Sequence, residues 1–193
     1  MRTTLIVAYV GLVTTFATAQ NSNHAKSTSP SDSKPSLNST LKQIQDSVND
    51  QGEIRYTMTS RNAVSGETVE DQYVVETSNA AADANSCALE VDARMVLNGK
   101  PQVQGRAALE FRNIDSLIVK SQSQAIGEKT KQSGITQWTG KISPESYMIQ
   151  AIQSGNLAGI LFFRGKETAN VVAKNIARAV ELCRGKTPTV LAN

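Results

Sequence analysis

Two cysteines, Cys87 and Cys183, have the clearest chemistry in this sequence. Cys87 opens a predicted strand and Cys183 lies near the end of a predicted helix, each on a face that we expect to be buried. In an exported chain, an even number of cysteines favours a disulfide, whereas a redox-active pair usually has close spacing and a neighbouring group that lowers a thiol pKa. We therefore predict a structural Cys87–Cys183 disulfide, with two buried free thiols as the alternative.

Catalytic residues of the common kinds are scarce. A catalytic triad needs an oriented imidazole, and the single histidine, His24, precedes the predicted domain. The sequence offers too few ligands for zinc and contains no glycine-rich phosphate loop, so we predict neither a metal site nor a cofactor. Paired carboxylates remain as a route to hydrolysis. The simpler interpretation is that these carboxylates face solvent, because they lie on or beside predicted strands. The candidates are Glu76, Glu90, Asp92 and Glu110.

A polar, glycine-containing stretch, 121–137, is long enough to be a mobile loop. Loops of this kind often carry binding residues on a rigid scaffold, and a plain flexible connector is the alternative. Trp138 and Tyr147 follow directly and are the candidate binding residues, because aromatic rings can line a pocket. Half-buried packing is the other common role of such rings.

The N-terminus has the pattern of a cleaved export signal. Met1 and Arg2 precede an apolar run from Leu5 to Val13, and Ala17-Thr18-Ala19 supplies small residues for cleavage before Gln20. The apolar run is too short to span a bilayer. We therefore predict a signal peptide at 1–19, a flexible polar linker at 20–35, one globular domain at 36–186 and a flexible tail at 187–193.

Composition and charge exclude several classes of protein. The chain has 193 residues, of which 39% are hydrophobic, and a net charge of +3 that is too small to indicate nucleic-acid binding. Its charges are unevenly spread. Seven acidic residues and no basic one lie between Asn62 and Ala93, whereas eight basic and three acidic residues lie from Arg94 to Lys141. This asymmetry could steer a charged partner, or the charges could satisfy one another across neighbouring strands.

Apolar spacing predicts a helix at each end of the domain. The first carries its apolar residues at intervals of four, three and four: Leu37, Leu41, Ile44 and Val48. The last is an amphipathic helix that ends at Gly185. Its apolar face consists of Ala169, Val172, Ala173, Ile176, Val180 and Cys183.

Between the helices, apolar residues alternate along short segments, as in strands. Alternating segments begin near Ile54, Tyr73 and Cys87, and Asn98-Gly99 predicts a tight hairpin into 103–111. Further strands are expected at 114–121, 134–139, 145–152 and 158–164. Strands that are grouped ahead of a terminal helix indicate an α+β fold. We expect a small antiparallel barrel or orthogonal sheet of the pleckstrin-homology type, closed by the C-terminal helix; a generic α+β sheet with two helices on one face is the alternative.

Three segments carry a resemblance to known proteins. The closing helix VAKNIARAVELCRGK (172–186), the opening helix SLNSTLKQIQDSVNDQG (36–52) and the turn Asn85-Ser86-Cys87 are similar to those of uncharacterised exported bacterial proteins. The likeness covers most of residues 36–186. It implies a small exported domain and implies no particular activity.

These observations favour an exported, non-enzymatic domain that binds a small ligand or an envelope protein. A small carboxylate-dependent hydrolase of envelope polymers and a structural envelope component are the alternatives. The ligand, the oligomeric state, periplasmic or extracellular residence and glycosylation at Asn38 stay open at this stage.

Overall fold

The computed structural model describes residues 36–62, 64–132 and 138–192, with side chains outside 129–139. The predicted signal peptide and linker lie outside the described residues. The elements run in the order α1 (Leu37–Asn49), β1 (Glu53–Asn62), β2 (Thr68–Asp83), β3 (Ala88–Leu97), β4 (Lys100–Glu110), the 3-10 turn η1 (Phe111–Asn113), β5 (Ser116–Ser121), α2 (Gln122–Gln132), β6 (Trp138–Ser143), β7 (Tyr147–Gln153), β8 (Asn156–Phe163), α3 (Lys166–Arg184) and β9 (Thr189–Ala192).

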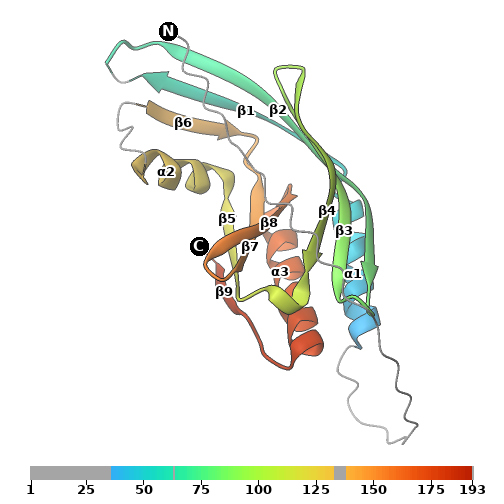
Figure 1. Ribbon diagram of the computed structural model, residues 1–193. Helices are drawn as coiled ribbons and strands as arrows, with labels where there is room; N and C mark the ends of the chain where they lie inside the picture. Colours follow the sequence, from blue (N-terminus) through green and yellow to red (C-terminus); the bar gives the residue numbers. More distant parts are fainter. Residues whose placement is uncertain (1–35, 63, 133–137, 193) are drawn as a thin grey trace, which may run out of the picture. The chain divides into compact units, whose positions relative to one another are not determined.

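The strands form two separate sheets, which confirms the predicted α+β class (Figure 1). One sheet has the order β4-β3-β2-β1-β6, and the other has the order β8-β7-β5-β9. All pairs with a registered partner are antiparallel except β5 with β9, which is parallel. The expected barrel does not close, because β4 and β8 each end their own sheet and are not hydrogen-bonded to each other.

Helix α1 occupies the segment with helical apolar spacing and is fastened to β2. Ser36 caps its start by accepting a hydrogen bond from the Ser39 N–H at 3.2 Å. At its other end, the Asn49 side chain accepts from the Ala80 N–H and donates to the Ala80 carbonyl, at 2.8 and 3.2 Å. These bonds satisfy the backbone of β2 where its register shifts, between Ser78 and Ala81.

The Asn98-Gly99 hairpin is confirmed. Both residues have positive φ, 48° and 77°, as a two-residue turn between β3 and β4 requires. The same geometry recurs at Ser154-Gly155, with φ of 49° and 78°, between β7 and β8. The second turn sets β8 antiparallel to β7 and leaves the far side of β8 as a sheet edge.

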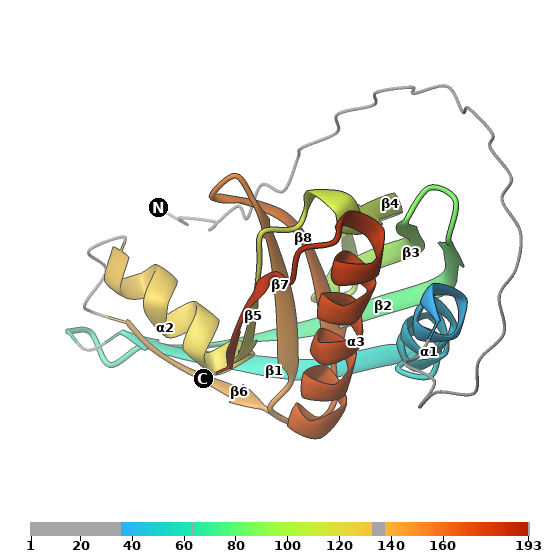
Figure 2. The same cartoon turned by 90° about the horizontal axis from the view of Figure 1, so that it is seen from below.

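Helix α3 lies between α1 and the second sheet (Figure 2). The apolar face expected from the sequence is buried there, and Val172, Ile176 and Val180 are completely inaccessible to solvent. Gly185 ends the helix in the left-handed region at φ 72°, and its N–H donates to the Glu181 carbonyl at 2.7 Å. The residues buried around α3 form the main core of the domain. This main core also includes Phe111 of η1 and Phe163 of β8.

A second, smaller core lies against the five-stranded sheet. It consists of Ile54, Tyr56, Val75 and Ile142, and Phe162 of β8 packs against it. Its neighbour Phe163 belongs to the main core. Because adjacent strand residues point to opposite faces, β8 is packed on both sides at this end.

Two segments differ from the expectation of irregular structure. Most of the stretch expected as a loop forms α2, and its described start carries a capping box: Ser121 accepts from the Gln124 N–H at 3.1 Å, and the Gln124 side chain accepts from the Ser121 N–H at 2.9 Å. Within the tail 187–193, expected to be flexible, Thr189–Ala192 instead forms β9 beside β5. Among the described helices, none combines the length and the apolar character that crossing a membrane requires.

Candidate functional site: the cleft between two sheet edges

The two cysteines form the predicted disulfide, which joins the residue before β3 to the last turn of α3. Their Cα atoms are 6.1 Å apart, and their sequence separation is 96. Cys87 is buried, and Cys183 packs against the edge of the main core. A bond in this position holds the end of α3 against the first sheet, which is a structural role.

Arg184 and Asp115 reinforce the same end of α3. The Asp115 carboxylate accepts from the Ser154 N–H at 2.7 Å and from the Arg184 guanidinium at 3.3 Å. The backbone hydrogen bond from Ser154, and then the contact with Arg184, lower the pKa of Asp115 below its usual value. The charged form of this carboxylate is therefore the one that the folded chain favours.

We expect Asp115→Asn to lower the midpoint of urea unfolding at pH 7. A carboxylate whose pKa is depressed by folding stabilises the native state above its unfolded pKa of about 3.9, and this contribution disappears as pH falls through the lower folded pKa. The difference in urea midpoint between the unaltered chain and Asp115→Asn should therefore shrink from pH 7 to pH 2.5. Glu70→Gln, at an exposed position of β2, is the control and should show a smaller gap at pH 7. A gap for Asp115→Asn that is constant with pH would contradict this assignment.

The candidate carboxylates are engaged on the exposed surface of the first sheet. The Arg106 guanidinium on β4 contacts Glu90 at 2.9 Å and Asp92 at 3.2 Å, and Arg94 lies 3.8 Å from Glu76. Charges of opposite sign thus meet across β2, β3 and β4, in line with the cross-strand alternative. Glu110 accepts a hydrogen bond from the Asn113 side chain. None of these four carboxylates lines the hollow between β4 and β8 or the hollow beside Tyr56 and Tyr73.

A polar cluster that sequence reasoning missed links the two sheets. The buried Ser146 hydroxyl donates to the Gln122 side-chain oxygen at 2.6 Å, and Gln122 shares a hydrogen bond with the hydroxyl of Tyr56 on β1. Burial raises the pKa of Tyr56 above its usual range. Nearby on β5, the Lys120 ammonium, whose side chain is only 9% exposed, contacts Glu128 of α2 at 2.5 Å.

This cluster is not arranged for nucleophilic catalysis. A serine nucleophile needs a base that accepts its proton, and the Ser146 hydroxyl donates instead to an amide oxygen. The Lys120 ammonium is held by Glu128. The hydrogen bonds satisfy buried polar groups where α2 meets both sheets, which indicates a structural function. Within the described ranges, no three acidic, histidine or cysteine side chains are grouped so as to hold a metal.

The two aromatic candidates lie in different sheets. Tyr147, on β7, is half-buried and packs against the main core. Trp138 begins β6, where its backbone pairs with Asn62, and its side chain is outside the described part of the chain. A pocket lined by both residues therefore stays a prediction.

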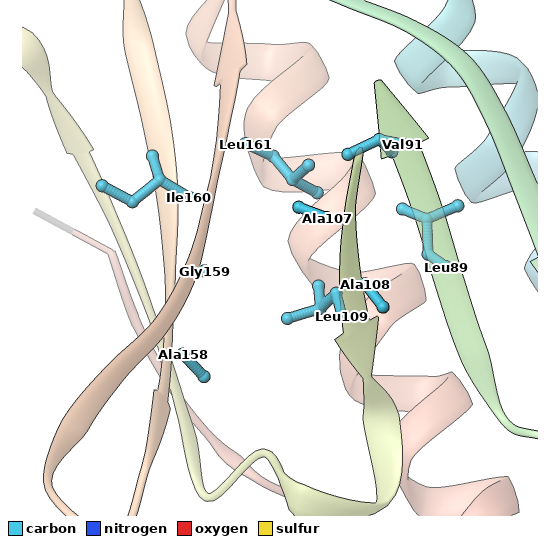
Figure 3. Close-up of a pocket in the computed structure, with 9 residues that line it drawn as sticks. All are labelled: Leu89, Val91, Ala107, Ala108, Leu109, Ala158, Gly159, Ile160 and Leu161. Atoms are coloured by element: carbon cyan, nitrogen blue, oxygen red, sulfur yellow. The ribbon is translucent and has the colours of Figure 1, made fainter. Parts of the chain in front are cut away.

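An apolar cleft lies where β4 and β8 face each other, and we call it the edge cleft (Figure 3). One wall is the end of β4 and the other is β8, with two buried residues of β3 behind. Its volume is about 50 Å³, and its lining carries no charged or polar side chain. The lining residues are Leu89, Val91, Ala107, Ala108, Leu109, Ala158, Gly159, Ile160 and Leu161.

The walls of the edge cleft are close but are not joined. A Cβ atom at Gly159 would lie 3.3 Å from Leu109 Cδ1, so the side chain of Leu109 approaches the bare backbone of β8 (Figure 3). Ala107, Ala108 and Ala158 are exposed to solvent. The sequence contained one signal for this site: β8 reads as NLAGILFF, a run without charge or proline that is unusual for a sheet edge.

Comparison of the chain with known protein families, with functionally described proteins and with solved structures finds no match. The arrangement of the described residues is therefore the basis for proposing a function.

Proposed function

We propose that the chain is an exported domain that binds another protein through the edge cleft and catalyses no reaction. The predicted export signal and the resemblance to exported bacterial proteins support the location. The Cys87–Cys183 disulfide is compatible with it, because such bonds persist in oxidising compartments. The observation that carries the binding proposal is the pair of open sheet edges, β4 and β8, that meet at a cleft with an uncharged lining.

The size and lining of the edge cleft favour a protein over a small molecule. Pockets for drug-sized ligands usually measure about 300–1,000 Å³ and place a few polar groups among apolar ones. The edge cleft, at about 50 Å³, is much smaller and has an apolar lining only. Sheet edges offer backbone hydrogen bonds instead, and these are used by proteins that pair strands.

Photo-crosslinking in the native host tests this proposal. A photoreactive amino acid replaces Ala158, which lines the cleft and is exposed, or Lys174, which is exposed on α3 away from the cleft. We expect a discrete covalent adduct from position 158 and none from position 174, and mass spectrometry of the adduct identifies the bound protein. Equal adducts from both positions, or none from position 158, would refute partner binding at the cleft.

A further inference from the structure

The two strands at the edge cleft differ in how they are protected against pairing. Natural edge strands usually carry charges, prolines or bulges that prevent another strand from adding. β4 has Lys100, Pro101 and Arg106, and its register against β3 shifts between Met95 and Val96. The register of β8 against β7 also shifts, and it skips Ala158, but β8 has no charge and no proline from Asn156 to Phe163. Because it lacks both charge and proline, the outer edge of β8 is the less protected of the two.

Gly159 lies in the middle of this unprotected edge. Its φ is not in the left-handed region, so no turn requires a glycine there. A glycine inside a strand often marks a place where another backbone approaches closely. With Ala158 beside it, Gly159 leaves the backbone of β8 bare over the residues that line the cleft. Beside Gly159, the large side chain that an added strand meets is that of Leu109.

The packing of β8 also keeps this edge in one conformation. Phe163 is completely buried in the main core, and Phe162 packs on the second core, on the other face of the strand. A strand held from both faces loses little further conformational freedom when a partner adds to it. The edge is thus preorganised for pairing.

We infer that the edge cleft binds an extended segment of a partner protein as an additional β-strand, hydrogen-bonded to the outer edge of β8 and with uncharged side chains facing the cleft. This inference rests on the proposed function and specifies the form of its partner. Every second residue of the added strand would point into the cleft, where about 50 Å³ of space suits small apolar side chains such as alanine or valine. A charged side chain is excluded there, because the lining offers it no partner.

Other occupants fit the edge cleft less well. The chain's own segment 20–35 contains no apolar side chain larger than alanine or proline, so it cannot supply a row of apolar residues. A second copy would have to bring one of its own strands together with the strands that neighbour it. Because β4 lies across the cleft, with Leu109 next to Gly159, a single strand along the edge of β8 meets fewer obstacles than the edge of another sheet.

Hydrogen exchange of the disulfide-bonded chain with a defined peptide tests the inference. The probe is an end-capped peptide with the sequence of Ala88–Met95, ALEVDARM, in which every second residue is apolar and which pairs with β4 as part of β3. We expect it to slow amide exchange in β8, between Leu157 and Leu161, at least tenfold at saturation. The same peptide N-methylated on alternate backbone amides, made in both registers, should lose binding in at least one register, because strand pairing depends on backbone N–H groups.

Charged variants of the cleft provide the matched comparison. Ala158→Lys and Ala108→Lys, on opposite walls, place a charge at exposed positions that line the cleft, and each should weaken peptide binding at least tenfold. Gln104→Lys places the same charge on an exposed position of β4 outside the lining and should leave binding unchanged. Two Lys variants on separate strands keep the test valid if one of them folds poorly.

Strand addition would be overturned by protection confined to residues outside β8, by equal binding of every N-methylated peptide, or by no protection at peptide concentrations up to about 1 mM, the level of very weak affinity. A dimer in sedimentation that Ala158→Lys dissociates would also overturn it and would assign the edge to self-association. If crosslinking from position 158 succeeds while strand protection fails, partner binding stands and its form as a strand does not.

Discussion

Replacing both cysteines with alanine should lower the free energy of unfolding by about 3–5 kcal/mol. The bond closes a loop of 96 residues, and loop closure of this length removes about 4.7 kcal/mol of chain entropy from the unfolded state, an upper-end figure. Native contacts at the same end remain in the variant, including the hydrogen bonds from Arg184 to Asp115 and to the Arg112 carbonyl. We therefore expect a folded but much less stable protein.

Urea unfolding followed by circular dichroism measures this effect. Alanine is preferred to serine at both positions, because Cys87 is buried and a hydroxyl there would require a hydrogen-bond partner. The control is the unaltered chain after reduction and alkylation in urea, which should also show a large loss. Hydrogen exchange in the last turn of α3 should rise more than in β7. A loss below about 1 kcal/mol would show that the bond constrains the unfolded chain little.

Ile176→Ala should cost about 2–5 kcal/mol of stability. Ile176 is completely buried on α3, where the main core joins α1, α3 and the second sheet, so its truncation removes apolar burial and leaves a cavity. Alanine favours the helix slightly, which offsets only a few tenths of a kcal/mol. The loss should appear mainly as a shift of the urea midpoint with an unchanged slope.

Val171→Ala is the matched control for this prediction. Val171 lies on the same helix but is 54% exposed, so its truncation should change stability by less than about 0.5 kcal/mol. Equal losses for Ile176→Ala and Val171→Ala would mean that α3 does not pack through the face that contains Ile176. This pair of variants therefore tests the orientation of α3, and the position of β8 depends on that orientation.

The cores matter for binding as well as for stability. Phe162 and Phe163 hold one end of β8 between two packed faces, while Leu157 and Ala158 at the other end stay exposed. A strand that is rigid and yet open along one edge is suited to adding another strand. The same exposure makes the segment prone to aggregation. Ala158→Lys should therefore reduce both partner binding and aggregation of the purified chain.

Local signals in the sequence predicted the elements whose stability depends on near neighbours. The four-three-four spacing from Leu37 to Val48 matches the buried face of α1, and Asn98-Gly99 forms the expected hairpin. Gly185 ends α3 as predicted. Each of these features depends on contacts between residues a few positions apart, which sequence periodicity and turn chemistry report directly. The cysteine pair was also predictable, since the chain contains only two.

Helix α2 shows where a local signal was present but was outweighed. The segment begins with the capping box Ser121-Gln122-Ser123-Gln124, yet its polar composition suggested a loop. The amphipathic pattern of α2 is weak, because its contacts to the rest of the fold include the polar Lys120–Glu128 pair and the Gln122–Ser146 hydrogen bond. Apolar periodicity does not detect a helix that is held by polar groups.

Patterns of residue type were enough to predict the α+β class, the C-terminal helix, the first hairpin and the cysteine pairing. The three-dimensional fold was needed to show that the sheets stay separate, that Thr189–Ala192 pairs with β5, and that β4 and β8 leave two open edges at an apolar cleft. The difference arises from distance along the chain. Strand order and edge position depend on hydrogen bonds between residues far apart in sequence, and no local pattern of side chains encodes which strand remains without a neighbour.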